Sequence, residues 1–333
     1  MMNSTLKNII LLFVLLLLVG SIFLWSAIYL PLSPGSSKIV DFTLEKGQGA
    51  KQISIALKEQ GIVKYGSIFR FYALMIGKAE KLQAGSYEVS SAMSIAQIVS
   101  KFLSGDVITE KLTIVEGWDL RDISKYFVEQ GISKDGELLT LAKKDYSFGL
   151  DSLKDKPKDA DLEGYLFPDT YEFIPGTSTE DILKKILSTF DDKFTPELRA
   201  EIARQNKSIF EIVTMASLIE KEVKSPEDKK MVSGILWKRI DIGMPLQVDA
   251  TVVYVINKQP SLEDLQIDSP YNTYRFYGLP KGPISSPGLD SIIAAIYPTE
   301  SNYLFYLSAA EDGRTIFSKT FAEHAAAIRK YLR

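Results

Sequence analysis

The stretch "MASLIEKEV", residues 215–223, holds two carboxylic acids in an otherwise apolar, helix-forming run. Glu220 and Glu222 are two residues apart, so at ~100° per residue a helix turns them about 200° away from each other. If one of them faces a cleft, the other does not. Burial raises the pKa of a carboxylic acid, and an acid poised near neutral pH can donate a proton to a leaving group and take one back.

The helix that must position these acids is well marked in the sequence. Ser208 and Glu211 form a capping box at its start, and Ser225-Pro226 ends it, because the residue before proline avoids the helical region. We therefore predict a helix over residues 208–224. Its apolar stripe recurs at helical spacing and consists of Ile212, Met215, Ile219 and Val223.

Glu220 lies at the edge of this stripe. It shares a side with the small residues Ala216 and Ser217, which precede it by four and three positions. A catalytic acid is one interpretation; the other is a boundary glutamate held by Lys221 or Lys224. The helix alone does not decide between them.

The composition excludes several kinds of chemistry. The 333-residue chain has a net charge of −3 and no basic block, which argues against a nucleic-acid partner. It contains no cysteine, so disulfides and thiolate nucleophiles are impossible. The single histidine, His324, precludes a zinc site built on several histidines, and its alanine-rich surroundings favour a helix-surface or capping residue.

A membrane anchor is predicted at the N-terminus. Residues 9–30 carry no charge and as a helix would span ~33 Å, enough to cross a hydrocarbon core. The alternative is a cleaved signal peptide, but the apolar run is longer than a usual signal core and no small-x-small cleavage site follows it. Lys7 and the amino terminus precede the span, which places the rest of the chain outside. Residues 31–38 are expected to form a linker.

The next region contains an internal repeat. Residues 43–62 and 113–132 both show a β-like segment, a glycine turn and an amphipathic helix closed by glycine, and residues 84–106 repeat this order with different letters. We therefore expect an α+β module over 39–115. The polar stretch 151–161 is interpreted as a loop. After it the pattern is mainly helical, with helices near 178–191, 195–205, 208–224, 226–242 and 288–297, and a two-stranded patch before the last helix.

Four stretches carry a family resemblance. They are "EGYLFPDTYEF" (163–173), "VTMASLIEKEV" (213–223), "GMPLQVDATVVY" (243–254) and "SPYNTYRFYGLPKGPISSPGLDSI" (269–292). In this order they resemble the MltG (YceG-like) family of endolytic murein transglycosylases. The resemblance covers essentially the whole chain. It implies a cytoplasmic N-terminus at 1–8, a LysM-like module at 39–115 and a catalytic domain at 116–333, on the periplasmic side of the bacterial inner (cytoplasmic) membrane.

The chemistry that the resemblance implies is a lyase reaction on peptidoglycan glycan strands. The bond between N-acetylmuramic acid and N-acetylglucosamine is cleaved by the muramic 6-hydroxyl, which leaves a 1,6-anhydro end and trims or terminates nascent strands. The matching catalytic residue is Glu220, as sole acid and base, while Glu222 would be a surface or supporting residue. One carboxylate suffices because an internal hydroxyl replaces the second group that glycosidases need. No metal or cofactor is implied, and peptidoglycan synthases are implied as protein partners.

The remaining motif residues suit a sugar-binding groove: Gln247, Tyr271, Asn272, Tyr274 and Glu163. Gln247 and Asp249 would share one face of an extended segment, although we favour a helix N-cap for Asp249. The tyrosines are otherwise half-buried core residues, and Glu163 or Asp169 either supports Glu220 or pairs structurally. Two rival functions stay open, a hydrolytic muramidase and a non-catalytic peptidoglycan-binding scaffold.

Overall fold

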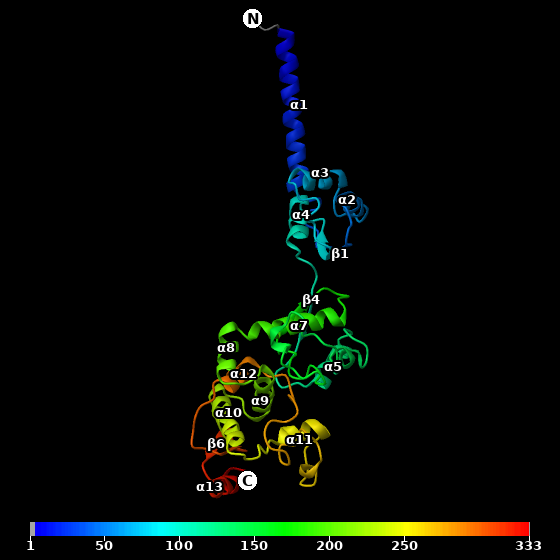
Figure 1. The fold of residues 1–333 in the computed structure, drawn as a ribbon. Helices are drawn as coiled ribbons and strands as arrows, with labels where there is room; N and C mark the ends of the chain where they lie inside the picture. Colours follow the sequence, from blue (N-terminus) through cyan, green and yellow to red (C-terminus); the bar gives the residue numbers. More distant parts are fainter. Residues whose placement is uncertain (1–3, 333) are drawn as a thin grey trace. The chain divides into compact units, whose positions relative to one another are not determined.

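The computed structural model describes residues 4–332, so residues 1–3 of the predicted cytoplasmic segment and residue 333 lie outside the described chain. The chain divides into two compact units (Figure 1). The first runs to Glu110 and includes Glu172–Pro175, and the second comprises Lys111–Tyr171 and the chain from Gly176 onward. The functional domain limits predicted from the sequence stay predictions.

The N-terminal helix α1 (Ser4–Tyr29) is apolar and almost entirely exposed. Its segment Thr5–Tyr29 is long and apolar enough to cross a membrane, as predicted. Only its last turns contact the rest of the first unit, where Ile28 is 3% exposed. There Phe23 lies 5.9 Å from Tyr65 between ring centroids, and Tyr29 lies 6.2 Å from Tyr72.

The module that follows has the order strand, helix, helix, strand, helix. Its elements are β1 (Ile39–Leu44), α2 (Ala50–Glu59), α3 (Gly66–Met75), β2 (Gly85–Ser90) and α4 (Ile95–Ser104). The two strands pair antiparallel, with Ile39 opposite Ser90 and Leu44 opposite Gly85. Alternation along β1 turns Phe42 and Leu44 into the core. The order of elements does not establish a LysM-like module, which stays a prediction.

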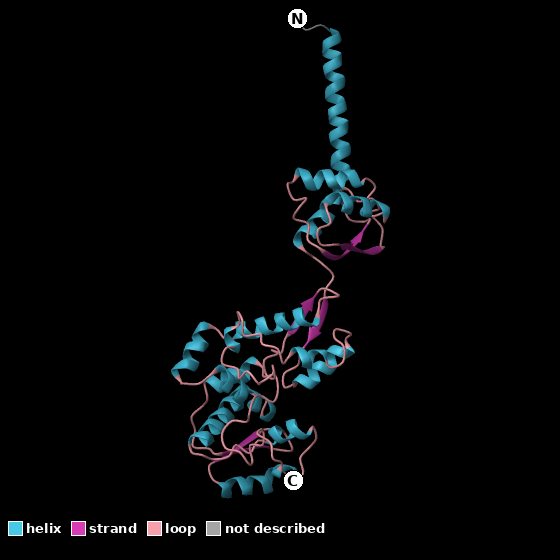
Figure 2. Ribbon diagram, turned by 45° about the vertical axis from the view of Figure 1, so that its right-hand side comes forward, coloured by secondary structure: helices cyan, strands magenta, loops and turns pink. Residues whose placement is uncertain are grey.

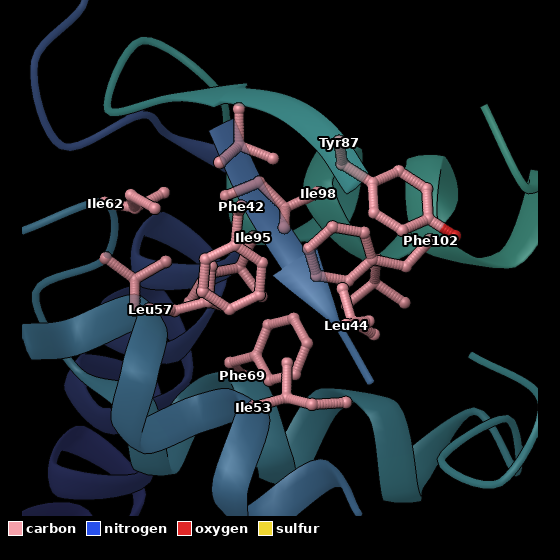
Figure 3. Packing of buried hydrophobic residues seen from close by; sticks show 13 residues of the cluster. Phe42, Leu44, Ile53, Leu57, Ile62, Phe69, Tyr87, Ile95, Ile98 and Phe102 are labelled. Carbon is pink, nitrogen blue, oxygen red and sulfur yellow. The ribbon is translucent and has the colours of Figure 1, made fainter. Parts of the chain in front are cut away.

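The core of this module is built around one aromatic ring (Figure 3). The ring of Phe102 from α4 stacks on Phe42 at 5.8 Å and lies 4.7 Å from Tyr87 and 6.2 Å from Phe69. The Tyr87 hydroxyl donates a 2.6 Å hydrogen bond to the Gln83 carbonyl, so this buried polar group is satisfied. Both strands and helix α3 are therefore tied to α4.

The predicted repeat is confirmed in structure. Gly47 and Gly117 turn the chain with φ of 86° and 79°, and the ten-residue helices α2 and α5 (Leu120–Glu129) follow them. Gly61 and Gly131 close both helices at φ 70°, a conformation that glycine adopts without steric penalty.

The second unit is mainly helical with short strands (Figure 2). The strands after α4 form two-stranded sheets, β3 with β4 and β5 with β6. The fold class is therefore mixed, with helices and small sheets. The remaining elements are β3 (Glu110–Thr113), α6 (Glu137–Leu141), η1 (Asp151–Leu153), β4 (Thr170–Phe173), α7 (Thr179–Lys193), α8 (Pro196–Arg204), α9 (Ile209–Glu222), α10 (Pro226–Asp241), α11 (Asp249–Ile256), η2 (Asp264–Gln266), α12 (Leu289–Ile296), β5 (Phe305–Ser308), β6 (Thr315–Ser318) and α13 (Phe321–Tyr331).

Helix α9 is the centre of the second unit. The predicted capping box is present: the Glu211 amide donates to Ser208 Oγ at 3.1 Å, and the Ser208 amide donates to the Glu211 carboxylate at 2.7 Å. The helix is buried on every side from Ile212 to Ile219, because α8, α10, α11 and α12 all pack on it. It ends at Glu222, two residues before the predicted end, because Val223 is already extended.

Candidate active site

The last turn of α9 sends its two glutamates into different surroundings. Glu220 enters a buried polar network, in which Lys229 Nζ lies 3.2 Å from both of its carboxylate oxygens. Ser291 Oγ donates to Glu220 Oε2 at 2.6 Å, and the Gly288 amide donates at 2.9 Å. The side chains of Glu220 and Lys229 are only 8% and 4% exposed.

This network joins three helices. Glu220 comes from α9, Lys229 from α10 and Ser291 from α12, so a single carboxylate ties together the elements that surround it. The prediction of apolar surroundings for Glu220 was incomplete, because distant residues supply these donors. The alternative of a glutamate held by a lysine describes the contacts, but the lysine is Lys229; Lys221 Nζ donates to the Gly117 carbonyl at 3.1 Å.

Glu222 instead lines a cavity of about 370 Å³. It is half-buried, and the Tyr306 hydroxyl of β5 donates a hydrogen bond to it. Burial raises the pKa of Glu222 to about 7 and nearby Asp249 acts in the same direction, while the bond from Tyr306 opposes the shift. Glu222 is the last residue of α9, and β5 covers it in part; its predicted supporting role stays a prediction.

Three further polar side chains line this cavity: Gln247, Asp249 and Tyr274. Gln247 has φ 52°, a left-handed conformation that costs a non-glycine residue about 1 kcal/mol or more. Its amide donates to the Thr273 carbonyl at 3.1 Å, which holds the turn in place. The Tyr274 hydroxyl donates to Asp249 Oδ1. Asp249 is the first residue of α11 and makes no cap hydrogen bond, so the predicted N-cap is wrong by one position.

A buried arginine and two rings complete the wall. Arg239 Nε donates to the Leu304 carbonyl at 2.8 Å and Nη1 to the Leu246 carbonyl at 2.7 Å, with the guanidinium 5.1 Å from the Phe305 ring. His324 stacks on the same ring at 5.2 Å and is half-buried, so it is not the surface residue that we expected. Burial lowers the pKa of His324, and Arg239 lowers it further, which favours the neutral imidazole.

Two residues predicted to contact substrate lie inside the protein. Asn272 is fully buried, and its side-chain amide donates to the carbonyls of Leu265 and Ile267 at 3.0 and 2.9 Å. Its Oδ1 accepts from the Tyr274 amide at 3.0 Å. We therefore assign it a role in shaping the loop that carries Tyr274, in place of the predicted contact with substrate.

Glu163 is 3% exposed and accepts from the Leu120 amide and the Tyr254 hydroxyl, both at 3.1 Å. Burial raises its pKa to about 8. Tyr271 packs against the Tyr254 ring at 5.1 Å, beside this acid and outside the Glu222 cavity. Asp169 accepts from the Thr170 amide and forms an ion pair with Lys193, so neither Glu163 nor Asp169 supports Glu220.

Of the residues predicted from the sequence to bind substrate, Gln247 and Tyr274 line this cavity, and their role in binding stays a prediction; Glu222, Arg239 and Tyr306 line it as well and were not among them. Tyr306 lies in "YLFYLSA", where alternation along a strand gives every second side chain a common face. That signal could have suggested a phenol that faces a site. Nothing local distinguishes Arg239 from an ordinary basic residue in the last turn of a helix.

Chemically, the cavity offers one acid that titrates near neutral pH, a second carboxylate, two phenols, an amide and a buried cation. Polar groups of this kind interleaved with Phe305 and Phe321 suit a carbohydrate, whose rings present hydroxyls at the edge and C–H groups on the face. Within residues 4–332, no group of three or more acidic or histidine side chains is placed to hold a metal ion.

The fold and the cavity define a class of protein: an apolar N-terminal helix, a small α+β module and a helical unit with a carboxylate-lined cavity. The family model described as the YceG-like family matches residues 42–330. The chain belongs to this family.

Known relatives carry a functional name. A Bacillus subtilis protein named endolytic murein transglycosylase is 34% identical over 332 residues, which cover 95% of this chain and 91% of that protein. A Streptococcus pneumoniae protein of the same name is 30% identical, with 91% of this chain and 60% of that protein covered. A crystal structure of a Listeria monocytogenes protein described as YceG-like matches with a TM-score of 0.59 and 35% identity, covering 87% of this chain and 99% of that one.

Proposed function

We propose that this chain is an endolytic peptidoglycan transglycosylase, a lyase that cleaves murein glycan strands and forms a 1,6-anhydro-muramic end. Family membership and the name of its relatives support the activity. The observation that carries the proposal is the cavity lined by Glu222, Gln247, Asp249 and Tyr274, which joins an acid of near-neutral pKa to groups that bind sugar hydroxyls.

We assign the acid/base role to Glu222 in place of Glu220. Glu222 faces the cavity, and its raised pKa keeps a useful fraction protonated near neutral pH. Glu220 is held inside the protein by Lys229, Ser291 and Gly288, where it stabilises the junction of three helices. Helical geometry left the choice between the two acids open, and the family resemblance implied Glu220; the matched variants below separate that assignment from the one proposed here.

The proposed reaction begins with the protonated Glu222 carboxyl. Its proton passes to the glycosidic oxygen as the bond from that oxygen to the muramic anomeric carbon breaks. The muramic 6-hydroxyl then attacks the anomeric carbon, and the Glu222 carboxylate accepts the hydroxyl proton, which returns the enzyme to its starting state. No water enters the products. The Tyr306 hydroxyl orients the carboxyl group, and Arg239 offsets negative charge that develops in the cavity.

The cellular setting is part of this proposal. Helix α1 would anchor the chain by a single span in the bacterial inner membrane, with the rest of the first unit and the second unit on the periplasmic side. The module at 39–115 would be LysM-like and bind glycan, and residues 116–333 would be catalytic. Cleavage near the membrane would terminate or trim nascent strands, beside peptidoglycan synthases.

The test is product analysis with matched variants. Full-length protein in detergent is incubated with purified peptidoglycan strands, and the released ends are identified by mass spectrometry. We expect anhydro ends from the parent, a loss of at least about 10²-fold in turnover for Glu222→Gln, and much smaller loss for a Glu220→Gln variant that is still folded. The opposite ranking in folded variants would return the catalytic role to Glu220.

A hydrolytic muramidase is the second candidate, because Asp249 places a further carboxylate beside Glu222. Two carboxylates are what hydrolysis of a glycosidic bond requires. Hydrolysis in ¹⁸O-labelled water leaves labelled reducing ends, whereas the lyase reaction leaves unlabelled anhydro ends. If strands are bound but never cleaved, the chain is instead a peptidoglycan-binding scaffold.

A further inference from the structure

The first unit carries an exposed face that its own core does not use. On α3, Phe69 and Ala73 point into the core, whereas Phe71, Leu74 and Met75 are 48%, 55% and 58% exposed. Ile55 of α2 is 47% exposed beside them. Apolar side chains grouped in this way mark a surface that contacts another phase or partner.

This face is hollowed and basic. A cavity of about 690 Å³ lies between α2 and α3 and contains three basic residues and one acidic residue, Glu59. We call this surface the α2–α3 face; its lining includes Lys51, Ile55, Lys58, Arg70, Phe71 and Leu74. A mixture of apolar and cationic side chains matches the interfacial layer of a bilayer with anionic headgroups.

The packing of α1 against the module places the α2–α3 face at the depth of the membrane surface. A hydrocarbon core takes about 20 helical residues, so a span that begins after Lys7 reaches to about residue 27. The module already covers α1 over Leu24 to Ile28 on one side, and Tyr65 at the start of α3 contacts Phe23. Figure 1 shows α3 at the end of the module that adjoins α1. The bilayer and the module therefore share the same turns of the helix.

We propose that the α2–α3 face rests on the headgroup layer of the membrane that α1 crosses, with Phe71, Leu74 and Met75 at the interface and Lys58 and Arg70 on the phosphates of anionic phospholipids. This inference rests on the proposal that α1 is a membrane span. A single span would leave the module free to swing, whereas a second contact fixes its orientation to the membrane surface. We call the module seated when the α2–α3 face contacts the membrane, and free when it does not. Each basic residue near an anionic surface raises the ratio of seated to free module about fivefold.

The experiment uses the absence of cysteine from the sequence. Single cysteines are placed in the full chain by Leu74→Cys on the face, Glu88→Cys on the exposed side of β2, and Phe13→Cys within α1. Each is labelled with an environment-sensitive fluorophore, and the protein is reconstituted in phosphatidylcholine vesicles with and without phosphatidylglycerol. Quenching by spin-labelled lipid is compared with quenching by aqueous iodide.

We expect lipid quenching at positions 13 and 74 and iodide quenching at position 88. In vesicles with phosphatidylglycerol, Arg70→Gln should lower the ratio of seated to free module about fivefold without changing the signal at position 13.

Lipid quenching at 13 but iodide quenching at 74 overturns the inference and leaves the anchor intact. Absence of lipid quenching at 13 overturns the anchor itself. Protection of position 74 from both quenchers shows that another protein surface covers the face, which also overturns the inference.

Discussion

Removal of the buried ammonium group of Lys229 should destabilise the second unit strongly. Lys229→Met keeps much of the apolar stem of the side chain and deletes its charge. The Glu220 carboxylate then stays buried without a cation at hydrogen-bond distance among the described residues, and the Ser291 hydroxyl and the Gly288 amide remain as donors. A buried charge without its counter-charge is one of the few single changes that cost several kcal/mol.

The size of the effect follows from the burial of the pair. With side-chain exposures of 4% and 8%, water screens the interaction little, and loss of one partner of such a pair costs about 3–5 kcal/mol. Because two donors to Glu220 remain, we expect about 3 kcal/mol. At an m-value of about 3 kcal/mol/M for a unit of this size, the urea midpoint should fall by about 1 M.

The assay is urea unfolding in detergent followed by tryptophan fluorescence. Trp118 and Trp237 belong to the second unit and Trp25 to α1, so a Trp25→Phe background confines the signal to the second unit. Lys230→Met, at an exposed neighbouring position, is the matched control. The double variant Glu220→Gln/Lys229→Met should recover about 2 kcal/mol. A loss below about 1 kcal/mol for Lys229→Met would show that the pair is solvated and would refute the reasoning.

Three further predictions concern Glu222, Glu163 and Gly234. If Glu222 is the acid, it must be protonated to act, so kcat/KM should fall as the pH rises through about 7. Asp249→Asn should shift this fall in the pH profile to lower pH, because it removes a like charge beside Glu222. A pH profile that does not shift contradicts the assignment. The folded-state pKa of Glu163, about 8, lies above its ordinary value of 4.5, so ionisation of this acid opposes folding, and stability should be lost as the pH rises between those values. Glu163→Gln should therefore flatten the dependence of the urea midpoint on pH. An unchanged slope would show that another group is responsible. Gly234→Ala should destabilise α10 by about 1–3 kcal/mol although alanine favours helix, because the new methyl group would lie 2.0 Å from the Thr299 carbonyl oxygen; a higher urea midpoint would contradict this packing.

Local signals in the sequence predicted much of the fold. The capping box of α9, the Ser225-Pro226 start of α10 and the repeated glycine turns each act within a few residues, and all are present. Local signals could not predict that α9 is buried on every side. The side of α9 that the sequence pattern leaves to solvent is covered by α12, which begins almost 70 residues later. Helix α3 gave no clean period either, since its apolar residues face both the core and the solvent.

The predictions for the candidate site have the same limit, because they too rest on local motifs. Gln247 and Tyr274 could be proposed because each lies in a distinctive motif, and both line the cavity. Asn272 and Glu163 lie in the same kind of motif, but their partners are carbonyls and amides of the surrounding loops. A motif therefore identifies residues that the site needs without separating those that meet a ligand from those that hold the loops.

The choice between Glu220 and Glu222 shows what a helix can reveal about its own acids. Helical geometry requires that they diverge, and that much is correct. Which of them is available for chemistry depends on what each meets after it leaves the helix. Glu220 meets a cation and two donors and becomes half of a buried ion pair. Glu222 meets a phenol and lies near a second carboxylate at the wall of a cavity. Its pKa of about 7 means that near neutral pH the carboxyl group is partly protonated and can both donate and accept a proton. Burial is common to both acids, so burial alone does not separate them. Glu220 lies beside Lys229 and Glu116, whereas Glu222 lies beside Tyr306, Asp249 and Arg239.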